Sequence, residues 1–171
     1  MSEVYLSVGS NIEREENIRA GFKMLTEYFG TLVCSPVYES VAVGFEGGNF
    51  YNLVVGFATR QDVKAVAQIL RDIEDQQHRV RDGVKFSSRT LDLDLILYED
   101  LVIDDGRLQI PRDEIEKYAF VLQPLADIVP EKLHPVLKRT YASMWADFDP
   151  NDVQQFAVAF ALQPSVACVV S

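Results

Sequence analysis

The order of strand-like and helix-like hydrophobic patterns between residues 4 and 98 constrains the fold more than any other feature of the chain. Apolar residues recur at every second position in some segments and at helical spacing in others. In chain order, the segments are 4–9, 13–29, 31–43, 50–58, 62–77 and 89–98, with the first, third, fourth and last strand-like. This β-α-β-β-α-β order is typical of a ferredoxin-like, split βαβ fold. We therefore expect an α+β protein with an antiparallel sheet, two helices on one face, and the other face open for a site.

Local signals bound the two expected helices. Gly30 follows the last apolar position of the first helix, Phe29, as a helix-ending glycine does. Asp62 precedes the second helix in the position of an N-cap. The sequence therefore marks the C-terminal end of the first helix and the N-terminal end of the second.

The last third of the chain has less regular patterns. We expect a small hairpin formed by 101–103 and 107–110, and helices at 113–118 and 121–128, with Pro124 at a kink or at a helix start. Bulky and small residues alternate over 156–162, which predicts a strand whose bulky face covers the core or pairs with a partner's edge. We expect a single domain over residues 1–171, with the residues after about 147 as a C-terminal extension.

Composition excludes several classes of protein. The chain has 171 residues, 48% of them hydrophobic, and no apolar run that approaches the ~20 residues of a membrane span. A net charge of −10 argues against nucleic acid or an anionic membrane as a partner. The start lacks a secretory pattern, and Cys34 and Cys168 fit free thiols better than a disulfide scaffold. These features predict a cytoplasmic protein with small-molecule partners, a monomer by default with a dimer left open.

The strand 89–98 carries two carboxylates in an alternating pattern. Asp92 and Asp94 are expected on one face, with the leucines at 91, 93 and 95 on the other. Paired carboxylates on a rigid strand suit a hard cation such as Mg²⁺ and the phosphates that it carries. A half-buried strand with its acids in water is the alternative for an isolated Asp-x-Asp.

A basic segment precedes this strand and reverses the sign of the chain's charge locally. Arg79, Arg81, Lys85 and Arg89 stand against a single acid, Asp82. Arginine can hold phosphate oxygens at two points, so acids and arginines together provide both halves of a nucleoside triphosphate site. A solvated basic turn is the alternative. The chain has no P-loop motif and no zinc-ligand spacing.

At this point the chain resembles the 6-hydroxymethyl-7,8-dihydropterin pyrophosphokinases, which are folate-pathway enzymes. The resemblance runs from residue 4 to about residue 135. The Arg-Thr-Leu-Asp-Leu-Asp core at 89–94 carries most of its specificity, and the supporting matches are Tyr-Leu-Ser-Val-Gly-Ser-Asn at 5–11, Ser-Pro-Val-Tyr-Glu-Ser at 35–40, Phe-Tyr-Asn at 50–52, and Ala-Phe-Val-Leu-Gln-Pro-Leu at 119–125.

The resemblance implies a Mg²⁺-dependent enzyme that transfers the β,γ-pyrophosphoryl group of ATP to a hydroxymethyl-dihydropterin and releases AMP. It implies that Asp92 and Asp94 bind two Mg²⁺ ions and, with Arg79 and Arg89, form the catalytic set. The resemblance implies that ATP is bound by Glu74, Arg79, Arg81, Arg89 and Arg107, with Arg112 as a replacement for a phosphate contact of the family. The residues that it implies for the pterin are Ser40, Val41, Val43, Phe50, Asn52 and Phe120, with the two phenylalanines on either side of the ring.

Several positions depart from the family's usual pattern. Arg112 stands where a histidine commonly follows the proline, and Tyr118 stands where an arginine is common. Phe86 and Ser87 replace the tryptophan and the glycine of the basic loop. These departures touch nucleotide contacts and loop closure but not the two aspartates. They leave open a divergent paralogue that is non-catalytic, or that has an altered substrate and binds a nucleotide or a partner.

Overall fold

The computed structural model describes residues 1–40, 49–80, 91–159 and 168–170. The first six elements are β1 (Ser2–Ser10), α1 (Arg14–Phe29), β2 (Leu32–Cys34), β3 (Val37–Ser40), β4 (Phe50–Thr59) and α2 (Val63–Val80). The elements from residue 92 onward are β5 (Asp92–Tyr98), β6 (Ile103–Asp104), β7 (Gln109–Ile110), α3 (Glu114–Lys117), α4 (Ala119–Ile128), α5 (Tyr141–Ala146), a 3-10 turn η1 (Pro150–Asp152), β8 (Gln155–Val158) and β9 (Cys168–Val170).

The strands form one main sheet with β1 and β4 at its centre. Its order is β5-β1-β4-β2-β9, and β4 also pairs with β3, which in turn pairs with β8. All these pairs are antiparallel except β2 with β9. The α+β class and the predicted order of the first six segments are therefore confirmed, with the third segment divided into two short strands.

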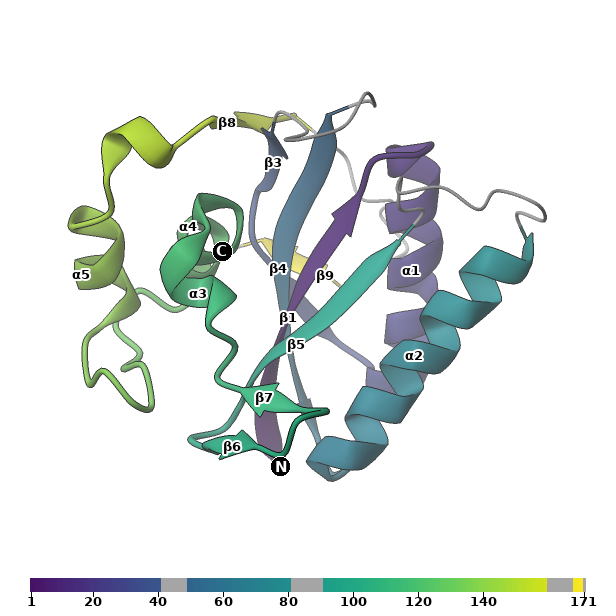
Figure 1. Ribbon diagram of the computed structural model, residues 1–171. Helices are drawn as coiled ribbons and strands as arrows, with labels where there is room; N and C mark the ends of the chain where they lie inside the picture. Colours follow the sequence, from purple (N-terminus) through teal and green to yellow (C-terminus); the bar gives the residue numbers. More distant parts are fainter. Residues whose placement is uncertain (41–48, 81–90, 160–167, 171) are drawn as a thin grey trace.

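One face of the sheet packs against α1 and α2 (Figure 1). Both helices turn an apolar stripe toward it, and the fully or almost fully buried members are Ile18, Phe22, Leu25, Val66, Leu70 and Ile73. The C-terminal end of α1 and the N-terminal end of α2 are where the sequence places them, whereas α2 runs to Val80 and not to the predicted residue 77. Gly30 has a φ of 79° and donates its N–H to the carbonyl of Thr26, and Asp62 accepts from the N–H of Ala65 at 2.8 Å.

The opposite face is covered rather than open, which corrects the sequence-based expectation. A second buried cluster joins Tyr5, Val54 and Ile96 of the sheet to α3, α4 and α5. Its α4 members are apolar almost all round the helix, so this helix must be buried on more than one side. Figure 1 shows these helices on the side of the sheet away from α1 and α2. The site must therefore lie where this second layer ends.

A β-bulge divides β5 into two parts. The register of β1 against β5 passes from Leu6 opposite Leu95 to Tyr5 opposite Leu97, so Ile96 is an extra residue. Leu95 faces the α1–α2 layer, while Ile96 and Leu97 both belong to the opposite cluster. The strict alternation expected over the whole strand therefore ends at Leu95.

Two expectations for the C-terminal part change. Residues 156–158 of the predicted strand 156–162 lie in β8, but Phe156 is 57% exposed and covers no core, whereas Val158 packs against the first cluster. Cys34 is disulfide-bonded, so the expectation of free thiols is wrong; the chain's other cysteine, Cys168, lies on the neighbouring β9. Residues 160–162 lie outside the described residues.

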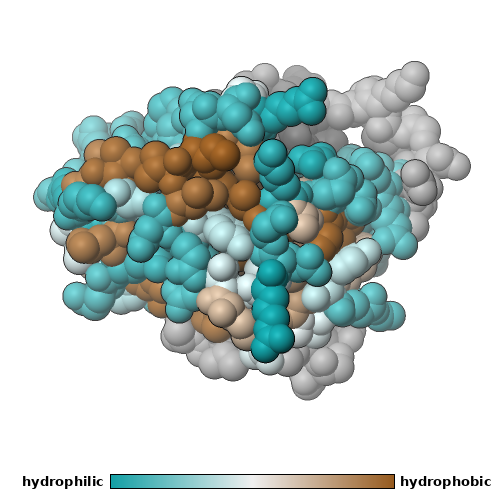
Figure 2. Space-filling model, turned by 90° about the horizontal axis from the view of Figure 1, so that it is seen from below, coloured by the Kyte–Doolittle hydropathy of each residue, from teal (hydrophilic) through white to brown (hydrophobic). Residues whose placement is uncertain are grey.

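The surface carries apolar side chains in the segment that connects α4 to α5. Leu133, Val136 and Leu137 are between 42% and 55% exposed. Figure 2 shows apolar surface on the side of the molecule on which Figure 1 places this segment. No helix in the described part of the chain combines the length and the apolar character that crossing a membrane requires.

A glycine in β4 makes room for a buried tyrosine ring from the neighbouring strand. Gly56 lies opposite Tyr5, and a Cβ atom at position 56 would be 2.7 Å from Cε1 of Tyr5. We expect Gly56→Ala to lower the free energy of unfolding by about 1–3 kcal/mol, because the buried ring cannot move away without strain. Ala58→Val, which enlarges an exposed position on the same strand, is the matched control and should change it by less than about 0.5 kcal/mol. Urea unfolding measures both, and a Gly56→Ala variant as stable as the control would contradict this packing.

Candidate functional site

A pocket of about 820 Å³ opens where β1 ends and β4 and β5 begin. The sheet supplies one wall, and the segment from Arg112 to Phe120 supplies a second. Residues between 151 and 155, from η1 to the start of β8, supply a third. The lining residues are Ser7, Gly9, Ser40, Phe50, Asn52, Asp92, Asp94, Arg112, Glu114, Lys117, Tyr118, Ala119, Phe120, Asn151, Asp152, Gln154 and Gln155.

Asp92 and Asp94 lie side by side on one face of β5, as the alternation predicts. They are half-buried and line the pocket, while Leu93 between them is buried on the other face. Asp94 pairs with Ser7 of β1, and Asp92 pairs with Gly9. Hydrogen bonding along β1 therefore fixes the backbone that presents both carboxylates.

The outer edge of β5 is held by α2. The N–H of Leu93 donates to Oε2 of Glu74 at 3.1 Å. Since β5 is the edge strand of the sheet that the described residues form, this N–H faces no strand among them. Glu74 thus anchors the strand between the two aspartates, and it is not one of the residues that line the pocket.

Arg112 brings a positive charge close to Asp94. It follows the cis peptide bond of Ile110–Pro111, and its backbone N–H donates to the carbonyl of the bulge residue Ile96 at 3.1 Å. Its guanidinium pairs with Glu114. Burial alone would lower the pKa of Arg112, but the hydrogen bond with Glu114 and the charge of Asp94 raise it. The side chain therefore remains a cation inside the pocket.

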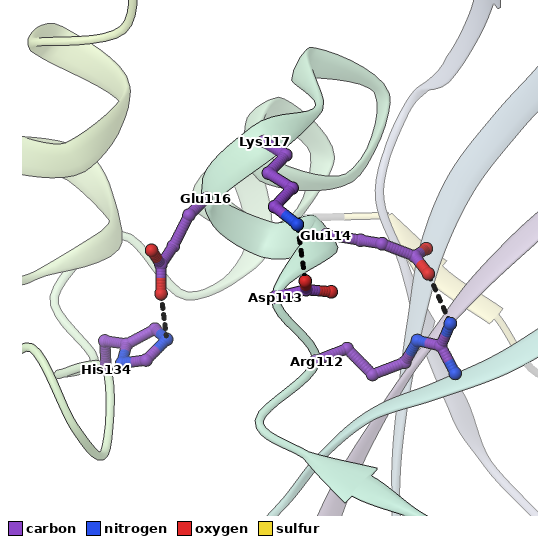
Figure 3. A network of polar contacts seen from close by, with 6 residues as sticks. All are labelled: Arg112, Asp113, Glu114, Glu116, Lys117 and His134. Atoms are coloured by element: carbon purple, nitrogen blue, oxygen red, sulfur yellow. Dashed lines mark hydrogen bonds and ion pairs between the residues drawn. The ribbon is translucent and has the colours of Figure 1, made fainter.

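Helix α3 connects the pocket to a buried histidine on its far side (Figure 3). Lys117 Nζ lies 2.6 Å from Asp113 Oδ2, and Lys117 lines the pocket. Glu116, on the other side of the helix, lies 3.8 Å from Nε2 of His134. The short helix thus places a second cation, Lys117, in the same cavity as Arg112.

The opposite end of the pocket presents a buried amide. Asn52 is 6% exposed, and its Nδ2 donates to Oγ of Ser40 at 3.0 Å. A Cβ atom at Gly9 would lie 2.9 Å from Oδ1 of Asn52, so only glycine lets this side chain take its position. The amide is therefore fixed by contacts with two strands before any ligand arrives.

Two aromatic side chains from different layers meet in the same cavity. Phe50 starts β4, and Phe120 belongs to the first turn of α4. The ring of Phe120 stacks on that of Tyr118 with the centroids 5.0 Å apart and an interplanar angle of 13°. Flat apolar faces beside a fixed amide are the means by which proteins bind a heteroaromatic ring.

Arg14, at the start of α1, holds the strands that carry this end of the pocket. Its Nη1 donates to the carbonyl of Asn49 at 2.8 Å and lies 2.6 Å from Oε1 of Glu39. The guanidinium carbon lies 3.9 Å from the centre of the Tyr51 ring. One side chain thus joins β3, β4 and the residue before β4.

The structure brings together seven of the nine predicted site residues whose side chains it describes. Those in the pocket are Ser40, Phe50, Asn52, Asp92, Asp94, Arg112 and Phe120. Arg107 is exposed in the turn between β6 and β7, and neither it nor Glu74 lines the pocket. Val41, Val43, Arg81, Arg89 and the departures Phe86 and Ser87 lie outside the described residues, as does the side chain of Arg79.

Sequence reasoning missed part of the lining. Ser7 and Gly9 occupy alternate positions of β1, so the period of two could have suggested that they share a face. Lys117 and Glu114 had no distinguishing pattern. Nothing in the sequence indicated that residues 151–155 would reach the pocket.

The described residues contain no group of three or more histidine, cysteine, aspartate or glutamate side chains that could enclose a metal ion. The aspartate pair on β5 nevertheless fits Mg²⁺, which commonly takes one or two protein carboxylates and completes its shell with water and substrate phosphates. The donor set therefore suits an ion that arrives with a phosphorylated ligand.

Comparisons with known proteins agree on one family. Residues 5–130 match the family model described as 7,8-dihydro-6-hydroxymethylpterin-pyrophosphokinase. The chain is 34% identical over 141 residues to the 2-amino-4-hydroxy-6-hydroxymethyldihydropteridine pyrophosphokinase of Aquifex aeolicus, covering 81% of this chain and 88% of that protein. It is 36% identical over 136 residues to the Pseudomonas aeruginosa protein of the same name, with 77% and 83% covered.

Solved structures give the same result for the fold. A wild-type HPPK-DHPS from Plasmodium falciparum superposes with a TM-score of 0.66 at 15% identity, over 85% of this chain and 43% of that one. An HPPK-DHPS in complex with substrates gives a TM-score of 0.66 at 16% identity with the same coverage. The chain thus spans less than half the length of these solved proteins, and at this identity they support the fold alone.

His134 makes stability depend on pH. It is 1% exposed, and its Nδ1 accepts hydrogen bonds from the N–H groups of Val136 and Leu137, both at 3.1 Å. Burial lowers its pKa from the ordinary 6.5, and the charge of Glu116 offsets only part of this. The stabilisation by the neutral ring is therefore complete above pH 6.5 and is lost as the pH falls through the lower pKa of the folded state.

We expect the free energy of unfolding of the wild type to fall more steeply than that of His134→Gln between about pH 7 and about pH 5, because only the wild type must charge a buried imidazole. His78→Gln, which replaces an exposed histidine, is the control and should follow the wild type. Denaturant unfolding at a series of pH values measures the slopes. Parallel curves for all three proteins would contradict the assignment of this pH dependence to His134.

Proposed function

The chain belongs to the 7,8-dihydro-6-hydroxymethylpterin-pyrophosphokinase family, and from this premise we propose that it transfers pyrophosphate from ATP to the hydroxyl group of 6-hydroxymethyl-7,8-dihydropterin. Members of this family are pyrophosphokinases of folate biosynthesis, so the chain is an enzyme of that class. The substrates, the metal and the roles of individual residues are the proposal. The observation that carries it is one pocket that is lined by a carboxylate pair, two cations, an amide and two aromatic rings.

In the proposed reaction, the hydroxyl oxygen of the pterin attacks the β-phosphorus of ATP. The bond between that phosphorus and the oxygen bridging to the α-phosphate breaks, AMP leaves, and the hydroxyl proton is released. No covalent enzyme intermediate is needed, so the protein must align the two substrates and stabilise negative charge. These requirements assign different work to the two ends of the pocket.

The aromatic end suits the pterin. Phe50 and Phe120 offer flat faces, and Asn52 offers both a donor and an acceptor that match the edge of a pterin. Because Ser40 and Gly9 fix the amide in advance, little ordering cost falls on binding. Val41 and Val43 complete this end of the proposed site on the strength of the family resemblance.

The charged end suits the triphosphate. Asp92 and Asp94 would hold two Mg²⁺ ions, which supply charge neutralisation and a fixed orientation to the phosphates when they are bound. Arg112 places permanent positive charge near Asp94, and Lys117 adds a second cation to the same pocket. Because Arg112 is held by Glu114 and lies near Asp94, it can contact a phosphate oxygen without leaving its position.

The remaining nucleotide contacts rest on the resemblance. Arg79 and Arg89 are proposed as catalytic phosphate contacts, and Arg81, Glu74 and Arg107 as ATP contacts. For Glu74, the hydrogen bond to Leu93 supports an additional role in positioning the strand of the two aspartates.

Three broader assignments accompany this function. We propose a ferredoxin-like classification, supported by the order β5-β1-β4 with β2 and β3 beyond β4. We propose one domain over residues 1–171 with an extension after about 147. We also propose that the protein is cytoplasmic and monomeric, without nucleic-acid or membrane partners. The disulfide at Cys34 removes one argument for the cytoplasm, namely the expectation that both cysteines are free thiols.

The deciding experiment is to measure AMP release from ATP and Mg²⁺ with and without 6-hydroxymethyl-7,8-dihydropterin. We expect AMP in amounts equal to the pyrophosphorylated pterin, and only when the pterin is present. ADP in place of AMP would show a single-phosphate kinase. Absence of any nucleotide product from folded protein that binds ATP would show a non-catalytic paralogue, and either result would overturn the proposal.

Asp92→Ala and Asp94→Ala test the charged end in the same assay. Each should lower kcat by about a thousandfold, because several kcal/mol of transition-state stabilisation depends on the bound metal. Folding should persist, since both side chains are only half-buried. Asp75→Ala, which removes an exposed carboxylate from α2, is the control and should keep full activity. An active Asp94→Ala enzyme would exclude the metal assignment.

Arg112→Ala tests the proposed phosphate contact. Loss of a charge-assisted hydrogen bond should raise KM for ATP by about 10- to 100-fold and leave the Kd of the pterin unchanged. Arg112→His, which introduces the residue common in the family, should restore part of the affinity. Arg139→Ala, at a surface arginine paired with Asp147, is the control. An unchanged KM in Arg112→Ala would remove Arg112 from the nucleotide site.

A further inference from the structure

A segment outside the family match forms part of the pocket. The match ends at residue 130, whereas Asn151, Asp152, Gln154 and Gln155 line the cavity. We call residues 149–158, which comprise η1 and β8, the tail segment. Figure 1 shows β8 beside β3, at the end of the sheet where the pocket opens. The cavity therefore has one wall that the family match does not include.

The tail segment is held in two ways. β8 pairs antiparallel with β3, with Gln155 opposite Ser40. The side-chain amide of Gln155 also reaches across to α4, where Nε2 donates to the carbonyl of Ala119 at 3.0 Å and to Oε1 of Gln123 at 2.7 Å. The backbone fixes the strand in register, and the side chain joins it to a different layer.

This second connection falls on the turn of α4 that carries Phe120. Ala119 directly precedes Phe120, and Gln123 lies one helical turn after Ala119. The other end of the helix is attached to β3 by the hydroxyl of Tyr38, which donates to Asp127. Gln155 therefore completes a pair of attachments, one at each end of α4, between this helix and the edge of the sheet.

We propose that Gln155 is a positioning residue for the pterin: it fixes the first turn of α4, and with it the ring of Phe120, against the tail segment, which closes the pterin end of the pocket. This inference rests on the proposed function, since it assigns that end of the pocket to the pterin. A glutamine suits the task because its NH₂ group can donate to two acceptors at once. The neighbouring Phe156 is 57% exposed and does not line the pocket, so it has no part in the arrangement.

The test measures the Kd of the pterin and the Kd of ATP separately, by calorimetric titration of the full chain. Gln155→Ala should raise the Kd of the pterin about tenfold, because two hydrogen bonds are lost, and leave the Kd of ATP unchanged. Gln155→Met retains the length of the side chain but not its donors, and should be impaired to a similar degree. Phe156→Ala, one residue along the same strand, should bind both ligands like the wild type.

The outcomes separate this inference from the proposed function. A wild type that binds no pterin would overturn both. A wild type that binds pterin, together with a Gln155→Ala variant of equal affinity, would overturn the inference alone. Full affinity in Gln155→Met would show that only the bulk of the side chain matters. Equal losses of both ligands in Gln155→Ala and Phe156→Ala, with lowered melting temperatures, would show general loosening rather than positioning.

Discussion

The register of β1 against its two neighbours is the constraint on which the rest of the structure depends. With Ser7 opposite Asp94 and Gly9 opposite Asn52, the hydrogen-bond ladders bring a carboxylate strand and an amide strand to the same end of one sheet. A slip of one residue in either ladder would turn the relevant side chains to the other face. The buried leucines of β5 prevent that slip, because it would expose them and bury two carboxylates.

The second layer gives the pocket its depth and its positive charge. α4 packs on the sheet with α5 behind it, and the segment from Arg112 to Phe120 borders the cavity with Arg112, Lys117 and Phe120. The apolar core and the polar pocket therefore occupy different parts of the same face of the sheet. Buried apolar contacts stabilise the middle, while polar and charged groups gather where those contacts end.

Patterns of short period were sufficient to predict the frame of the molecule. The first six segments follow directly from alternation or helical spacing, and the shared face of Asp92 and Asp94 follows from the period of two. Three features could not be found in this way. The bulge at Ile96 depends on the register between two strands. The covering of the second face by α4 depends on the side of the sheet to which the chain crosses after β5. The contact of Gln155 with Ala119 joins residues 36 apart, and no local pattern records such a pairing.

The bulge also separates β5 into two parts that can change independently. Residues before Ile96 present carboxylates to the pocket, while Ile96 and Leu97 pack in the apolar layer beneath α4. The alternation of side chains between the two faces of the sheet shifts by one residue at Ile96. Substitutions that repack the part after the bulge therefore need not change the face on which the two aspartates lie. One strand therefore combines a part that lines the pocket with a part that packs in the core, and the bulge lets the side chains of one part be exchanged without changing the facing of the other.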